Sequence, residues 1–115
     1  IIIDRFIDST IAYQHYGMGI NLKIISLINQ FLLKDIRVNF TFLNLVNNKN
    51  LSTRLKKRKI LNRYDRFNLK FYERVQKGFL KIAKQKKKSY QIINSNLEIK
   101  INEDIVINKV KNLIK

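Results

Sequence analysis

The spacing of apolar residues along the chain predicts helices that alternate with short strands. The clearest helix covers residues 65–85, where apolar side chains recur every three or four positions and form one stripe, typical of a buried helix face. That stripe consists of Phe67, Phe71, Val75, Phe79 and Ile82. Further helices are predicted at residues 8–17, at residues 51–59 and, after the N-cap residue Asn21, at residues 22–34. In the last of these, an apolar face recurs at Leu22, Ile25, Ile28 and Leu32.

Strands are predicted where short runs are rich in β-branched and aromatic residues. Residues 39–46 and 89–94 have this composition, and residues 1–3 read as the end of a buried strand. The polar residues 47–50 are expected to end the strand predicted at residues 39–46. Strands that alternate with helices indicate an α/β fold with a mainly parallel sheet flanked by helices.

A final helix is expected to begin at Asn102, whose side chain would cap its first turn. Glu103 and Asp104 would then lie near the positive end of the helix dipole. The inner face of this helix would consist of Val106, Val110, Leu113 and Ile114.

Composition limits the classes of protein that fit. The chain has 115 residues, 45% of them apolar, which is enough for one domain with a core. Cysteine is absent, so disulfides and thiolate metal sites are excluded. No apolar run approaches the roughly 20 residues that span a bilayer, and no signal peptide is visible. We therefore expect a cytoplasmic protein without a membrane partner.

The net charge of +16 has two interpretations. Basic clusters at residues 54–59 and 84–88 are typical of surfaces that bind nucleic acid, and Tyr64, Phe71 and Tyr72 could stack on bases. Alternatively, an AT-rich genome enriches lysine, asparagine and isoleucine, which number 17, 14 and 19, and depletes proline, which is absent. We favour codon bias, which makes a nucleic-acid partner the weaker hypothesis.

Polar and ionisable residues gather in the run DRFIDSTIAYQHYGMG, residues 4–19. Asp4 and Arg5 follow the first predicted strand, and ligands of open α/β sheets bind at such strand ends. His15 is the only histidine and has no second histidine or cysteine to share a metal, so a structural role is favoured. The residues alone thus predict a polar turn near a ligand site and no metal ligand.

This run resembles the segment that follows the third strand of bacterial thymidylate kinases. NFTFLNL is similar to the family's next strand, RLKKRKILNRYDRF to its lid, FYERVQKGFLKIA to the helix after the lid and YQIIN to its last strand. The resemblance is collinear over nearly all of residues 1–115. It implies the C-terminal half of a P-loop nucleoside monophosphate kinase fold, with the lid at about residues 54–66. The chain contains no Gly-x-x-x-x-Gly-Lys-Ser/Thr loop, so the phosphate-loop half is expected to be missing.

The resemblance implies a dTMP kinase that transfers the γ-phosphoryl group of ATP to dTMP with the help of Mg²⁺. In a full-length enzyme, usually a homodimer, Arg5 would bind the dTMP phosphate, and Asp4 would orient Arg5 or water near the metal. Arg58 and Arg63 would close over the phosphates with the lid, assisted by Lys56. The alternatives are a surface Arg5 paired with Asp4, and lid cations that are simply solvated.

The resemblance also implies a site for the thymine and sugar at Ser9, Thr10 and Gln14, and for the deoxyribose at Tyr13. Ser9 could instead be the N-cap of a helix beginning near Thr10, and Tyr13 could be a core residue. Met18 occupies a position where the family commonly has arginine, so a phosphate or lid contact is expected to be lost. A nucleic-acid-binding module and an inactive structural remnant remain the competing hypotheses.

Overall fold

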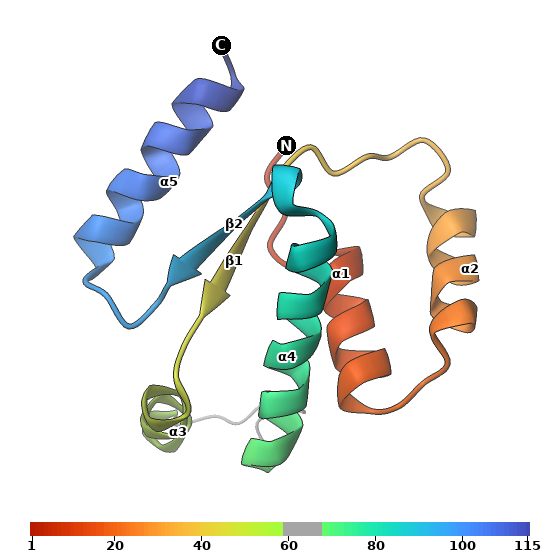
Figure 1. Ribbon diagram of the computed structural model, residues 1–115, viewed down its shortest axis with the longest axis horizontal. Helices are drawn as coiled ribbons and strands as arrows, with labels where there is room; N and C mark the ends of the chain where they lie inside the picture. Colours follow the sequence, from red (N-terminus) through yellow and green to blue (C-terminus); the bar gives the residue numbers. More distant parts are fainter. Residues whose placement is uncertain (59–67) are drawn as a thin grey trace.

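The computed structural model describes residues 1–58 and 68–115 as helices arranged around a pair of parallel strands (Figure 1). In chain order the elements are α1 (Ile7–Thr10), the π-helical η1 (Ile11–Gly17), α2 (Leu22–Leu32), β1 (Thr41–Leu45), α3 (Asn48–Lys57), α4 (Leu69–Gln85), the 3₁₀ turn η3 (Lys87–Ser89), β2 (Tyr90–Asn94) and α5 (Ile99–Leu113). The α/β class predicted from the alternating pattern is confirmed.

The two strands β1 and β2 pair in parallel, with Leu43 opposite Ile92 and Asn44 opposite Ile93. Parallel neighbours require a crossover connection, which here contains α3 and α4. In Figure 1, α4 and α5 lie on opposite sides of the strand pair. The helices cover the strand pair only in part, since Leu43 and Ile93 are buried but Ile92 is 50% exposed.

The core lies where α4 packs against α1 and η1. Its buried residues are Ala12, Phe71, Tyr72, Val75 and Ile82, and Phe79 is packed at its edge. The stripe predicted on the long helix thus forms the core face of α4, which Asn68 caps by accepting a hydrogen bond from the Phe71 amide at 3.0 Å. Phe67, Asp65 and the rest of residues 59–67 lie outside the described residues.

Two glycines allow η1 and α4 to approach closely. A Cβ on Gly17 would lie 2.6 Å from Phe71 Cε2, and a Cβ on Gly78 would lie 2.6 Å from Tyr16 Cδ2. Arg74 adds hydrogen bonds from Nε and Nη2 to the Gly17 carbonyl, at 3.2 and 3.0 Å. The absence of side chains at these two glycines therefore fixes the distance between the two helices.

The expected strand at residues 1–3 is wrong. Ile1, Ile2 and Ile3 are exposed and take part in no strand. A β-branched triplet favours extended backbone, but a strand needs a neighbour to accept its hydrogen bonds. Among the described residues, only β1 and β2 pair, so this triplet has no strand beside it.

Helix ends were predicted with mixed success. Asn21 caps α2 as predicted, because its side chain accepts a hydrogen bond from the Lys23 amide. The expected end of the strand before residues 47–50 is confirmed, since β1 ends at Leu45. The next helix begins earlier than predicted, because Asn47 accepts a hydrogen bond from the Asn50 amide and caps α3, which starts at Asn48. The expected cap at Asn102 is wrong, since α5 begins three residues earlier, at Ile99. Glu103 and Asp104 therefore lie beyond the first turn.

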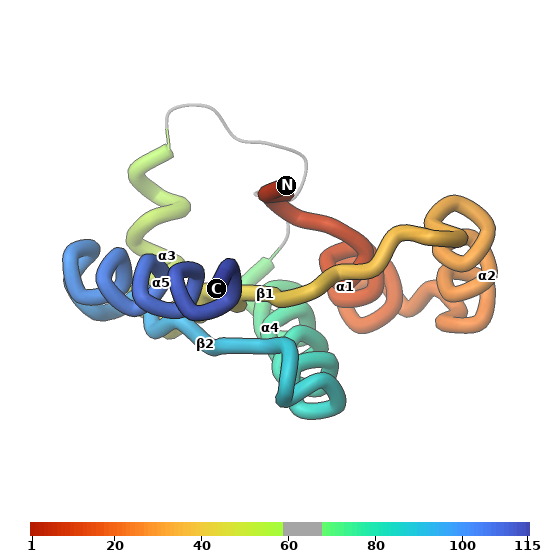
Figure 2. Tube along the Cα trace, turned by 90° about the horizontal axis from the view of Figure 1, so that it is seen from above, coloured from red at the N-terminus to blue at the C-terminus, as the bar shows by residue number. Residues whose placement is uncertain are grey.

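Much apolar surface is exposed on the outer helices. On α2 only Ile25 of the predicted face is buried, whereas Leu22, Ile28 and Leu32 are exposed. On α5, Val106 and Val110 are half-buried, but Leu113 and Ile114 are exposed, contrary to the predicted inner face. The arrangement is open: the radius of gyration is 15.3 Å, against about 13 Å for a compact domain of roughly this length. Figure 2 shows α2 and α5 at opposite ends of the molecule.

None of the helices described by the structure is long and apolar enough to cross a membrane.

Candidate functional site

A cavity of about 230 Å³ lies between the N-terminal helical segment, the end of β1, α3 and α4. Three residues predicted from the sequence line it: Arg5, Tyr13 and Arg58. Arg5 precedes α1, Tyr13 lies in η1, and Arg58 follows the last residue of α3. The fold therefore brings together on one cavity three side chains that are up to 53 positions apart in the chain.

Arg5 has a left-handed backbone conformation, with φ of 62°. Few residues other than glycine adopt this conformation, and such strain persists only where the surrounding structure enforces it. Its guanidinium lies 5.6 Å from the centroid of the Tyr13 ring, within cation–π range. Among the described residues, ion pairs join Lys86 to Asp8 and Lys100 to Asp104. The alternative interpretation of Arg5, a surface residue paired with Asp4, therefore has no ion pair to support it among these residues.

Tyr13 is both a core residue and a wall of the cavity. Its half-buried ring lies 6.0 Å from the Phe71 ring and 6.2 Å from the Phe79 ring, in tilted and edge-on geometries. Tyr13 can therefore be a core residue and also line the cavity. Tyr13 also lies in a π-helical turn, a wide turn that is rare and often found at functional sites.

The other predicted site residues that the structure describes do not line this cavity. Ser9, Thr10 and Gln14 belong to the same helical segment as Tyr13, with Thr10 exposed and the other two half-buried. Ser9 lies within α1 rather than at its N-cap, which is Phe6, so the capping alternative is wrong. Asp4 and Lys56 are exposed, and Arg63 lies outside the described residues.

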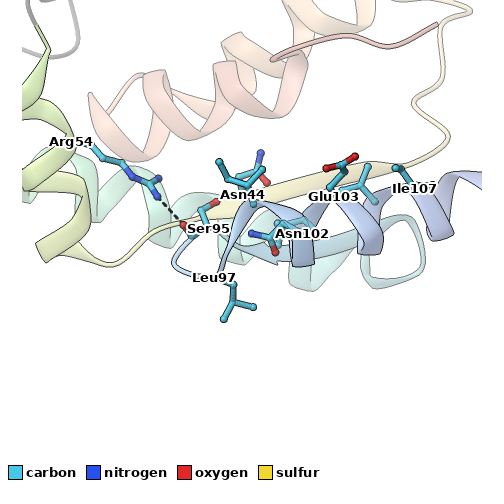
Figure 3. A pocket seen from close by; sticks show the side chains of 10 residues that line it. Asn44, Arg54, Ser95, Leu97, Asn102, Glu103 and Ile107 are labelled. Carbon is cyan, nitrogen blue, oxygen red and sulfur yellow. Dashed lines mark hydrogen bonds between the residues drawn. The ribbon is translucent and has the colours of Figure 1, made fainter.

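A second, larger cavity of about 710 Å³ was not predicted from the sequence (Figure 3). It lies between α5 and one face of the strand pair, near the carboxyl ends of β1 and β2, where the paired residues Asn44 and Ile93 line it. Its lining combines apolar side chains such as Leu97 and Ile107 with the polar Arg54, Asn102 and Glu103. Arg54 reaches from α3 to the loop after β2 and donates a hydrogen bond to the Ser95 carbonyl at 2.8 Å.

One residue that lines this larger cavity has a buried polar atom without a hydrogen-bond partner among the described residues. Asn102 Nδ2 donates to the Asn94 carbonyl at 2.9 Å, whereas Asn102 Oδ1 is buried and has no hydrogen-bond partner. The only sequence signal for this cavity was the basic run containing Arg54. Asn102 was assigned to a helix cap instead, because contacts between α5 and the loop after β2 cannot be read from local spacing.

A buried carboxylate that lines neither cavity lies at the start of the N-terminal helical segment. Asp8 is 9% exposed and accepts hydrogen bonds from Lys86 Nζ at 2.8 Å and from the Tyr90 hydroxyl. Burial raises the pKa of Tyr90 well above its usual value, and the hydrogen bond to Asp8 and its charge raise it further, against a smaller lowering by Thr41. Tyr90 is therefore a protonated donor at neutral pH.

His15 and Met18 have structural contacts. His15 Nδ1 lies 2.8 Å from the Ile20 carbonyl, which closes the turn after η1, and Met18 packs against the core. Among residues 1–58 and 68–115, no three His, Cys, Asp or Glu side chains are grouped so that they could hold a metal ion.

Comparison with known proteins relates this geometry to a family. The family model described as thymidylate kinase matches residues 1–106. The chain is 44% identical over 104 residues to the thymidylate kinase of Ehrlichia ruminantium strain Gardel, which covers 90% of this chain and 49% of the relative. It is 32% identical over 111 residues to that of Sulfurihydrogenibium sp., covering 96% of this chain and 53% of the relative.

A solved structure supports the same relationship. The crystal structure of thymidylate kinase from Ehrlichia chaffeensis is similar to this one with a TM-score of 0.60 at 28% identity, covering 97% of this chain and 49% of that chain. The parallel strands and flanking helices are thus part of a P-loop kinase fold. The family model and the relatives identify the kind of kinase: the chain belongs to the thymidylate kinase family. It spans about half the length of the curated relatives it matches.

Proposed function

We propose that this chain is the acceptor-site and lid portion of a single-domain dTMP kinase, which transfers the γ-phosphoryl group of ATP to dTMP and yields dTDP. The observation that carries this proposal is the convergence of Arg5, Tyr13 and Arg58 on one cavity. An aromatic ring beside two guanidinium groups suits a nucleotide. The ring can pack against the base or the sugar, and the guanidinium groups can bind the anionic phosphate.

Arg5 is proposed to bind the dTMP phosphate and to stabilise the charge that develops during transfer. Phosphoryl transfer depends mainly on positioning and on neutralising charge spread over the equatorial oxygens. A guanidinium group donates two parallel hydrogen bonds to such oxygens, which a lysine cannot do. Asp4, the neighbouring acid, is proposed to orient Arg5 or a water molecule.

Tyr13 is proposed to pack against the deoxyribose and to hinder binding of a sugar with a 2′-hydroxyl. Ser9, Thr10 and Gln14, on the same helical segment, are proposed to contact the thymine and sugar. Polar ring atoms that lose water on binding must be paired, and short hydroxyl and amide side chains can pair them.

The lid is proposed to comprise about residues 54–66, with Arg58, Arg63 and Lys56 acting on the phosphates. We also propose that the larger cavity holds the base of ATP. Its volume of about 710 Å³ suits a nucleotide-sized ligand, and it lies near the strand carboxyl ends, where α/β proteins bind ligands. Its polar lining residues Arg54, Asn102 and Glu103 are proposed to recognise the base.

Mg²⁺ is proposed to enter with the ATP phosphates, since proteins usually bind this ion through one or two carboxylates together with substrate phosphates and water. The full-length enzyme is proposed to be a cytoplasmic homodimer, which is what the family resemblance implies.

The proposal is tested with a chimera in which this chain replaces the 104 residues that it matches in the Ehrlichia ruminantium enzyme. The chimera is expected to show ATP turnover that depends on dTMP. The 115-residue chain by itself should turn over no ATP, because its sequence has no phosphate-binding Gly-x-x-x-x-Gly-Lys-Ser/Thr loop. A folded chimera that is inactive, together with tight and steeply salt-dependent DNA binding by the chain alone, would favour the nucleic-acid hypothesis instead.

The role of Tyr13 predicts a change in sugar preference. In the chimera, Tyr13→Ala should reduce the preference for dTMP over its ribose counterpart by roughly 5- to 150-fold, since exclusion of one group by packing is typically worth about 1–3 kcal/mol. The measurement is kcat/KM for both nucleotides. Tyr13→Phe is the control, because it keeps the ring and should keep the preference. An unchanged preference in Tyr13→Ala would leave Tyr13 as a core residue only.

A further inference from the structure

The helical segment that carries the proposed acceptor site begins without a local cap. Phe6 occupies the N-cap position of α1, and no side chain there accepts a hydrogen bond from the first turn. The Ser9 amide bonds to the Phe6 carbonyl at 3.0 Å, which is a backbone turn only. No capping side chain orients the first turn, so its position depends on contacts with other elements.

Asp8 provides those contacts. Its carboxylate lies in the first turn, where the helix dipole favours a negative charge. Lys86, the residue that follows α4, contacts one carboxylate oxygen, and Tyr90, the first residue of β2, contacts the other. These partners are 78 and 82 positions away in the sequence, so the bonds attach the helix start to the frame formed by α4 and the sheet.

The position of the helix start determines where Arg5 lies. Arg5 is only three residues before Asp8 and is held in a left-handed conformation. Its contact with the Tyr13 ring, at 5.6 Å, is of a kind that contributes only about 0.5–1 kcal/mol at an exposed site. That contact alone cannot keep the guanidinium on the cavity if the helix start moves.

We propose that Asp8, held by Lys86 and Tyr90, is a positioning residue that keeps Arg5 and Tyr13 in their shared place on the smaller cavity. Buried ion pairs are weak evidence for stability, because desolvation offsets their attraction, but they can select one geometry. Asp8 does not contact the substrate in this proposal. The expected effect of Asp8 on catalysis rests on the proposed function, whereas its expected effect on the position of Arg5 does not.

The kinetic test uses the chimera with Asp8→Asn, which removes the charge at nearly constant volume. We expect kcat/KM for dTMP to fall about tenfold or more, because small displacements of positioned groups cost rate steeply, while KM for ATP stays unchanged. The matched control is Asp104→Asn. Asp104 also pairs with a lysine, Lys100, at 3.1 Å, but on the exposed face of α5, and its removal should leave both parameters unchanged.

The structural test uses the same chimera and needs no activity. The NMR signals of the Arg5 Nε–H group and the Tyr13 ring should shift in Asp8→Asn and stay in place in Asp104→Asn. Tyr90→Phe removes one hydrogen bond without removing the buried charge, and it should shift the same signals if Asp8→Asn does not fold.

The outcomes separate the two proposals. An inactive chimera in which the Arg5 signal still shifts would contradict the proposed function and support the positioning role. Unmoved Arg5 and Tyr13 signals in both Asp8→Asn and Tyr90→Phe would overturn the positioning role. So would an equal rise of KM for dTMP and ATP in an active chimera, since that result indicates a general loss of structure.

Discussion

Replacing Arg5 by alanine in the chimera is expected to lower kcat by about 10²-fold or more. The proposed mechanism places this guanidinium on the phosphate that accepts the transferred group, and removal of one charge-stabilising donor typically has an effect of this size. Arg5→Lys should recover only part of the rate, because an ammonium group keeps the charge but cannot donate two parallel hydrogen bonds. The measurement is steady-state turnover at saturating dTMP and ATP.

Arg37 provides the control for charge and side-chain length. It is exposed in the segment between α2 and β1 and lines neither cavity. Arg37→Ala should therefore leave kcat unchanged. A near-normal kcat in Arg5→Ala would remove Arg5 from the mechanism and leave its unusual backbone conformation without a catalytic reason.

Replacing Phe71 by alanine is expected to destabilise the fold by about 3–5 kcal/mol, the usual range for deleting a buried phenylalanine ring. Phe71 is 2% exposed and contacts the rings of Tyr13 and Tyr72 at 6.0 and 5.4 Å between centroids. Its ring also fills the space beside Gly17, so its removal would open a cavity between α4 and η1. Urea-induced unfolding of the chimera, followed by circular dichroism, measures the effect.

The matched control is Phe31→Ala, because Phe31 lies on α2 and is 73% exposed. This change should alter the stability by no more than about 0.5 kcal/mol, as surface substitutions usually do. Equal unfolding midpoints for Phe71→Ala and the unsubstituted protein would mean that the interface of α4 with η1 is not the core of this fold.

The features that the sequence predicted correctly are those set by neighbouring residues. The stripe containing Phe71, Val75 and Ile82 determines a helix and its buried face, since residues three and four apart share a side of the helix. Asn21 caps α2 because its side chain reaches an amide two residues away. The strands β1 and β2 were predicted from their β-branched and aromatic composition, and the parallel sheet from the alternation of strands with helices.

The candidate site was predictable only in part. The run around Arg5 and Tyr13 was identified by its resemblance to a family, and two of the residues it indicated, with Arg58, do line one cavity. Spacing along the chain could not show that Gln14 lies off that cavity, because the direction of its side chain depends on the π-helical turn of η1. The larger cavity went unpredicted for a similar reason: it forms between elements rather than within one.

By itself, then, the sequence determined the presence of the main helices, the cap of α2 at Asn21 and the apolar face of α4. These features depend on contacts within about one helical turn. The tertiary structure decided the rest. It left the isoleucines of residues 1–3 exposed because no strand described by the structure lies beside them. It also gave Asp8 its partners 78 and 82 residues away, since the pairing of a buried charge depends on which distant elements the fold brings to it.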